Sequence, residues 1–178
     1  AQMALFMLAN HVMSPHYFHQ LRTEQQLGYL VGTGYVPINT LPGIAFYVQS
    51  PNVDCTRLYQ ATVDFFHEFL SYMQQISDIE FSELKQGLIS QLTERDSSLG
   101  ARAKRLWLAL GQSDTGFDLT ARIVNAMQAL NKQQFCDLLQ QLLASDYDAL
   151  ILASGPNSAK NHVKALTNEQ LRQKIALA

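Results

Sequence analysis

Apolar side chains at helical spacing mark the first 27 residues as a helix. This helix is expected to end at Leu27, with Gly28 in the left-handed conformation that closes many helices. The apolar face starts within the first residues, with no N-cap residue and no positively charged leader before it, which indicates a piece of a longer chain. The expected apolar positions are Met3, Met7, Leu8, Val12, Phe18 and Leu21.

The next two segments have the composition of paired strands. Residues Tyr29–Ile38 and Gly43–Ser50 are rich in β-branched and aromatic side chains, and the Asn-Thr-Leu-Pro-Gly connection between them is typical of a turn. Gly32 and Gly34 lie inside the first strand, where they indicate that another group packs closely against it. The pattern therefore predicts a β-hairpin after the first helix.

Amphipathic helices with recognisable start signals follow the hairpin. Asp54 can cap one helix, Ser77 and Glu80 form a capping box before a second, and Asn131 and Gln134 form a similar box before a later one. The apolar face of the helix after Asp54 contains Leu58, Ala61, Phe65, Phe69 and Met73. Two further helices are expected over Leu99–Leu110, which holds Trp107, and over Asp118–Leu130.

The order of these elements defines the fold class. The apolar run Tyr147–Pro156 predicts a buried strand, and the tail from Asn157 predicts a short amphipathic helix. Strands cluster early and recur once late, so we expect a single α+β domain over residues 1–178, with helices packed on one face of a mostly antiparallel sheet. Three strands are few for so many helices, which indicates that the sheet lacks strands from its N-terminal side. The unpaired edge would invite a dimer of the isolated piece.

Composition narrows the function classes. Hydrophobic residues make up 47% of the 178 residues and charged residues 16%, as in a soluble globular protein, and the length allows one good core or two very small ones. A net charge of −2 provides no basic surface for nucleic acid or an anionic membrane, and no apolar run is long enough to span a bilayer. Cys55 and Cys136 lie too far apart for a zinc-binding motif and give no disulfide framework.

The histidines give no complete catalytic or metal-binding motif. His16 and His19 are three residues apart and could share a helix face as metal ligands, but no third ligand follows nearby, which favours solvent-facing histidines. His67 and Glu68 resemble the start of an HExxH motif, yet Ser71 stands where its second histidine belongs. The inverted motif HxxEH does not occur, nor does a nucleophile elbow, a P-loop or a dinucleotide fingerprint.

The stretch "LRTEQQLGYLV" at residues 21–31 places Arg22 near the end of the first helix and Tyr29 directly after Gly28. Residue types alone favour a scaffolding role, because arginine is a good helix former and tyrosine is common in strands. Followed by the glycine-containing strand, the turn and "GIAFYVQS", the stretch closely resembles the insulinase/pitrilysin family of zinc metallopeptidases, the inverzincins.

The resemblance is to the fourth and last α+β domain of that family, a pitrilysin/LuxS-like domain. It extends from about Met3 to Pro156, through "ISDIEFSELKQGLISQL" and through Trp107 followed by "FDLTARIVNAMQALNKQQF". It implies a zinc-dependent metalloendopeptidase that encloses peptides between two halves of one long chain. In this family the HxxEH site lies in the N-terminal half, so Zn²⁺ is expected in the parent protein. This piece alone is expected to contain no metal ligand and to have no peptidase activity.

The resemblance also implies roles for Arg22 and Tyr29, at positions that contact substrate near the scissile bond. Tyr29 would donate a hydrogen bond to the oxyanion as a catalytic residue, and Arg22 would bind substrate backbone carbonyls. Gln26 and Gly28 would set the turn that aims the pair, with Gly28 at positive φ, and the Gln49 side chain is a further candidate for the chamber.

Partners and compartment follow from the same resemblance. The expected partners are the N-terminal half of the same polypeptide and peptide substrates, with no nucleic acid and no membrane. Family analogy places the parent in the periplasm, with any targeting signal upstream. A non-catalytic structural or chaperone-like member that has lost the metal is the alternative, and the retention of Arg22 and Tyr29 favours the peptidase.

Overall fold

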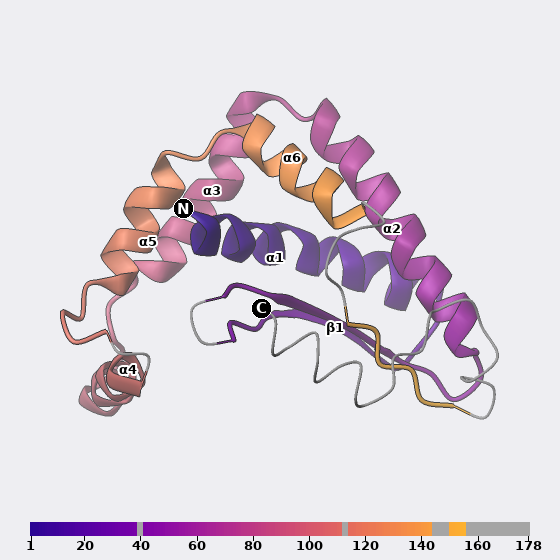
Figure 1. Cartoon of the computed structure of the whole chain (residues 1–178), viewed down its shortest axis with the longest axis horizontal. Coiled ribbons are helices and arrows are strands. Elements are labelled where there is room, and N and C mark those ends of the chain that lie inside the picture. The colour runs from indigo at the N-terminus through magenta and orange to yellow at the C-terminus, as the bar shows by residue number, and fades with distance from the viewer. Residues whose placement is uncertain (39–40, 112–113, 144–149, 156–178) are drawn as a thin grey trace, which may run out of the picture.

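The structure is a computed structural model that describes residues 1–38, 41–111, 114–143 and 150–155. Figure 1 shows α1 lying along the hairpin, with the other helices on the far side of α1 from the strands or at its ends. Helices therefore pack on one side of an antiparallel sheet, and the α+β class is confirmed. The elements are α1 (Gln2–Phe18), the π-helix η1 (His19–Glu24), β1 (Leu30–Tyr35), β2 (Ile44–Gln49), α2 (Cys55–Gln75), α3 (Asp78–Leu92), α4 (Leu99–Gly111), α5 (Leu119–Gln128) and α6 (Lys132–Leu143).

The expected hairpin is confirmed. Its antiparallel register runs from Leu30 opposite Gln49 to Tyr35 opposite Ile44, and one further bridge lies nearer the turn. Side chains alternate between two faces, so Val31 lies buried on the face toward the helices while Leu30 is exposed on the other.

The two glycines of β1 have different surroundings. A side chain at Gly32 would collide with Tyr47, because a Cβ there would lie 2.7 Å from the Tyr47 Cζ atom. This confirms the expected close packing at Gly32. At Gly34 the nearest atom, the Val36 Cγ2, would be 4.0 Å from an added Cβ, so nothing packs closely there.

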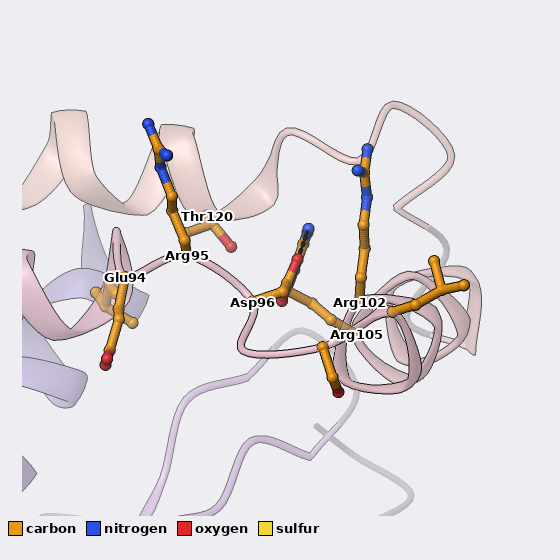
Figure 2. Close-up of a pocket in the computed structure, with 9 residues that line it drawn as sticks. Glu94, Arg95, Asp96, Arg102, Arg105 and Thr120 are labelled. Atoms are coloured by element: carbon orange, nitrogen blue, oxygen red, sulfur yellow. Dashed lines mark hydrogen bonds and ion pairs between the residues drawn. The ribbon is translucent and has the colours of Figure 1, made fainter.

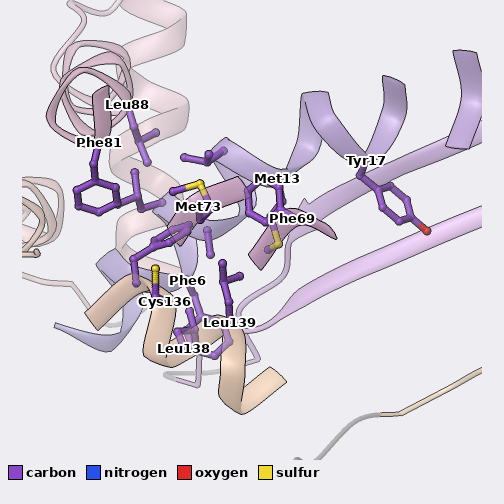
Figure 3. Close-up of a cluster of buried hydrophobic side chains, with 14 of the residues drawn as sticks. Phe6, Met13, Tyr17, Phe69, Met73, Phe81, Leu88, Cys136, Leu138 and Leu139 are labelled. Carbon is purple, nitrogen blue, oxygen red and sulfur yellow. The ribbon is translucent and has the colours of Figure 1, made fainter. Parts of the chain in front are cut away.

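One hydrophobic core surrounds α1. Leu8, Val12 and Leu21 are buried as predicted, whereas Phe18 is 48% exposed and does not belong to the buried stripe. Figure 3 shows side chains from α1, α2, α3 and α6 meeting in this core. The ring of Tyr17 contacts both the hairpin and α2, which joins the two halves of the fold.

The predicted helix starts are confirmed by their hydrogen bonds. Asp54 accepts from the backbone at the start of α2, 3.0 Å away. Ser77 and Glu80 bond each other's backbone N–H groups, which is a complete capping box for α3. Asn131 and Gln134 do the same before α6, at 2.8 and 3.0 Å.

Helix α4 stands apart from the core, as Figure 1 shows. None of its described residues is buried, and Trp107 is 75% exposed. Among the residues that the structure describes, no helix is both long and apolar enough to cross a membrane.

The expected buried strand Tyr147–Pro156 is wrong in its described part. Residues 150–155 form no strand, and their leucine and isoleucine side chains are 39–85% exposed. An apolar run becomes a buried strand only where its backbone groups form hydrogen bonds with the edge of a sheet. Here the Ser154 carbonyl instead accepts a hydrogen bond from the Cys55 thiol, 3.4 Å away. The remainder of the run, and the helix expected from Asn157, lie outside the described residues.

Candidate functional site

The site begins where α1 continues into the π-helix η1. The Gln25 N–H donates to the Gln20 carbonyl five residues back, at 3.0 Å, and the Leu27 N–H donates to the Leu21 carbonyl, at 2.9 Å. These wider turns end the helix at Glu24, so the predicted end at Leu27 is wrong. Such π turns occur often at functional sites.

In the turn after η1, Gly28 is required for a different reason from the one predicted. The left-handed residue is Gln26, with φ of 52°, and Gly28 does not adopt a positive φ. A side chain at Gly28 would instead meet β2, because a Cβ there would lie 2.5 Å from the Gln49 carbonyl oxygen and 3.1 Å from the Val48 Cγ1. Glycine is needed for this close approach of two backbones, which the sequence pattern did not reveal.

Arg22 and Tyr29 lie on either side of this turn. Leu21 is fully buried, so the neighbouring Arg22 on η1 is exposed. Tyr29 is 58% exposed, and its backbone N–H donates to the Gln49 carbonyl oxygen at 3.1 Å. Within the described part of the chain, neither the Arg22 guanidinium nor the Tyr29 hydroxyl makes a hydrogen bond or an ion pair. Both groups are therefore available to a ligand.

Two side chains of α2 hold the segment that carries these residues. The Gln20 Nε2 donates to the Glu68 Oε2 at 2.6 Å, and the Arg57 Nη2 donates to the Gln25 Oε1 at 3.0 Å. Sequence reasoning missed both pairs, because their members lie 48 and 32 positions apart and no local pattern connects them. The Gln49 side chain is exposed, and its role in the chamber stays a prediction.

The histidines of α1 and η1 do not form a metal site. The His16 ring packs 5.1 Å from the Tyr72 ring, and burial, with a smaller effect of His19, lowers the pKa of His16. The His19 Nδ1 lies 3.5 Å from the Glu24 Oε1. In the described ranges, no group of three or more His, Cys, Asp or Glu side chains could hold a metal ion. These residues therefore do not fit a zinc centre.

A concavity of about 680 Å³ lies away from the candidate residues, between α4, α5 and the loop before α4. Figure 2 shows Arg95, Arg102, Arg105 and Asp96 in its wall. The Arg105 guanidinium donates to both carboxylate oxygens of Asp96, at 2.8–3.3 Å, and these hydrogen bonds lower the pKa of Asp96. Neither Arg22 nor Tyr29 lines this concavity, so it is not the predicted site.

Comparison with known proteins gives a consistent set of relatives. A family model described as "PQQ synthase PqqF-like, C-terminal lobe domain 4" matches residues 8–107, a range that includes η1 and the hairpin. Protease 3 of Escherichia coli strain K12 is 26% identical over 155 residues, which are 86% of this chain and 16% of that protein. A nardilysin-like protein of Arabidopsis thaliana is 26% identical over 130 residues, 73% of this chain and 13% of that protein.

A solved structure agrees with these relatives. The crystal structure of pitrilysin matches with a TM-score of 0.72 and 26% identity, over 79% of this chain and 15% of that chain. The chain thus spans about one sixth of the length of the curated relatives it matches.

Proposed function

Because the chain belongs to the PqqF-like C-terminal lobe domain 4 family, a C-terminal domain family of the insulinase/pitrilysin peptidases, we propose that it is the last domain of a longer zinc-dependent metalloendopeptidase. In that protein it contributes substrate binding and oxyanion stabilisation, and the zinc ligands come from elsewhere. The proposed partners are the N-terminal half of the same polypeptide and the peptide substrate.

One observation carries this proposal: Arg22 and Tyr29 are exposed and unpaired within the described residues, while the backbone beneath them is fixed. Leu21 is fully buried on one side of the turn, and the Gly28 backbone lies against the end of β2 on the other. Polar groups that the fold does not use can bind a ligand, and an anchored backbone beneath them reduces the order that has to be gained on binding.

The chemistry of the two side chains suits peptide hydrolysis. When water attacks a peptide carbonyl, negative charge develops on the carbonyl oxygen, and a tyrosine O–H held near it is a preorganised hydrogen-bond donor. The Arg22 guanidinium presents several N–H donors in a planar fork, which binds backbone carbonyls irrespective of the neighbouring side chains. The pair therefore supports a peptidase that binds the substrate through its backbone.

The described residues do not fit a zinc site, so the metal belongs to another part of the parent in this proposal. The 178-residue chain alone is expected to bind no stoichiometric zinc and to hydrolyse no peptide. Metal analysis of the purified chain, combined with a fluorogenic peptide assay, checks this expectation. One zinc per chain together with peptidase activity would contradict it.

The test of the function compares kcat/KM of the longer polypeptide for a quenched fluorescent peptide, wild type against Tyr29→Phe. This change removes one hydroxyl and little packing, so we expect a loss of about tenfold to a thousandfold, mainly in kcat. Tyr59→Phe is the matched control, because Tyr59 is a similarly exposed tyrosine on α2, at 42%, outside the candidate site.

The outcomes separate the candidate functions. An active parent that is indifferent to Tyr29→Phe would make the motif a scaffold and overturn the proposed role. A parent with no activity on any peptide would favour the structural or chaperone-like alternative instead.

A further inference from the structure

The segment that presents Arg22 and Tyr29 is packed into the core only at its ends. Leu21 and Leu27 are buried at 0% and 7% exposure, whereas Arg22 and the two residues after it are exposed. Apolar packing alone therefore fixes where this segment starts and ends. It leaves the direction of the exposed side chains to other contacts.

Helix α2 supplies two such contacts, one at each end of η1. Glu68 accepts from Gln20 just before Arg22, and Arg57 donates to Gln25 just after it. Glu68 and Arg57 are eleven residues apart on α2, or about 16 Å along its axis at 1.5 Å per residue. A segment held at two separated points is restrained in rotation as well as in position, which a single hydrogen bond cannot achieve.

A carboxylate lies near the second of these contacts. The Asp64 Oδ2 lies 3.9 Å from the Arg57 Nη1, on the exposed face of α2. The guanidinium therefore donates a hydrogen bond to the amide oxygen of Gln25, and the nearby Asp64 carboxylate attracts it only weakly. The planar guanidinium donors give this hydrogen bond a defined direction, and Gln25 lies at the turn that leads to Tyr29.

We infer that Gln20, Gln25, Arg57 and Glu68 are positioning residues, through which α2 sets the direction in which Arg22 and Tyr29 meet the substrate. This inference rests on the proposed function of the same site. None of the four residues needs to touch the substrate. Their effect comes through the π turn, whose wider hydrogen bonds and left-handed Gln26 need support from outside the helix.

The expected size of the effect follows from the exposure of the two pairs. Exposed side-chain pairs contribute little individually, so Arg57→Met or Glu68→Ala should each lower kcat/KM of the longer polypeptide by about two- to fivefold. The loss should lie in kcat, because the geometry of the transition state is more sensitive than binding to a small misplacement.

Two comparison variants show whether the lost hydrogen bond is responsible. Glu68→Gln should retain activity within about twofold, because its amide oxygen still accepts from Gln20. Arg105→Met is the control for Arg57→Met, since Arg105 is likewise an arginine paired with a carboxylate, half-exposed and far from η1 in the sequence. Failure of Glu68→Gln to rescue, or an equal loss in Arg105→Met, would overturn the inference.

A double-mutant cycle with Tyr29→Phe tests whether Arg57 acts through Tyr29. If it does, Arg57→Met should cost less in the Tyr29→Phe background than in the wild type. Additive losses would overturn the inference for Arg57. If Tyr29→Phe alone has no effect, the proposed function fails; if it is costly while Arg57→Met and Glu68→Ala are silent, only the positioning inference fails.

Amide hydrogen exchange on the 178-residue chain gives a readout that does not depend on activity. Exchange in the segment 22–29 should be faster in Arg57→Met and in Glu68→Ala, and unchanged in Arg105→Met. Unchanged exchange in both tether variants would overturn the inference.

Discussion

At the scale of single residues, Gly28 has the most demanding position in the site. Its replacement by alanine would place a Cβ 2.5 Å from the Gln49 carbonyl oxygen, so the turn or the end of β2 would have to shift. Such a shift typically costs about 1–3 kcal/mol of unfolding free energy. We expect Gly28→Ala to lower the urea midpoint accordingly, and to reduce activity of the longer polypeptide because Tyr29 is the next residue.

Gly34→Ala is the matched control for that experiment. Gly34 lies in the same hairpin and does not have a positive φ, and an added Cβ there would lie 4.0 Å from the Val36 Cγ2, without a clash. Alanine there should leave the free energy of unfolding unchanged or raise it by up to about 1 kcal/mol, because glycine inside a strand loses more backbone entropy on folding. Equal losses for the two alanine variants would show that the close approach at Gly28 is not what requires glycine.

At the scale of elements, the local features could be predicted from the sequence and the long-range ones could not. The capping boxes at Ser77 and Asn131 depend on residues three positions apart, so the sequence displays them directly. Arg22 and Tyr29 were proposed through the resemblance of "LRTEQQLGYLV" to a family motif, and their roles stay predictions. The reason for Gly28 was hidden, because the carbonyl that requires it belongs to Gln49, which is distant in the sequence.

The C-terminal end of α2 is stabilised by a lysine from another helix. The Lys132 ammonium donates to the Gln74 and Ile76 carbonyls, at 3.0 and 2.5 Å, and so caps the C-terminal end of α2 from the start of α6. Lys132→Met keeps the aliphatic stem and removes the charge, which should cost about 1 kcal/mol of unfolding free energy in a denaturant titration. Lys104→Met on α4 is the control, because no hydrogen bond or ion pair of Lys104 is present among the described residues. A similar loss in both variants would indicate a general charge effect.

At the scale of the whole molecule, the side chains that stabilise the fold lie in the core between α1 and α2, whereas α4 carries a large exposed apolar side chain. Phe65 is 1% exposed, packs edge-on against Tyr17 at 5.0 Å and stacks on Phe69 at 5.5 Å, so it joins α1 to α2 in the core. Trp107 is larger but 75% exposed, on a helix with no buried residue. By side-chain size alone, Trp107 would contribute more than Phe65 to the free energy of unfolding. Because Phe65 is buried and Trp107 is exposed, we expect the larger contribution from Phe65.

Alanine substitutions at these two positions test that assignment. Phe65→Ala should cost about 3–5 kcal/mol through lost burial and a cavity, and Trp107→Ala less than about 0.5 kcal/mol. Far-UV circular dichroism should follow the unfolding, because the only tryptophan is already exposed to water in the folded state and its fluorescence would change little. A large loss in Trp107→Ala would mean that α4 is packed onto the body of the molecule in solution. The small loss that we expect would instead show that α4 does not contribute to the core that supports α2. Helix α4 would then not support the segment that carries Arg22 and Tyr29 either.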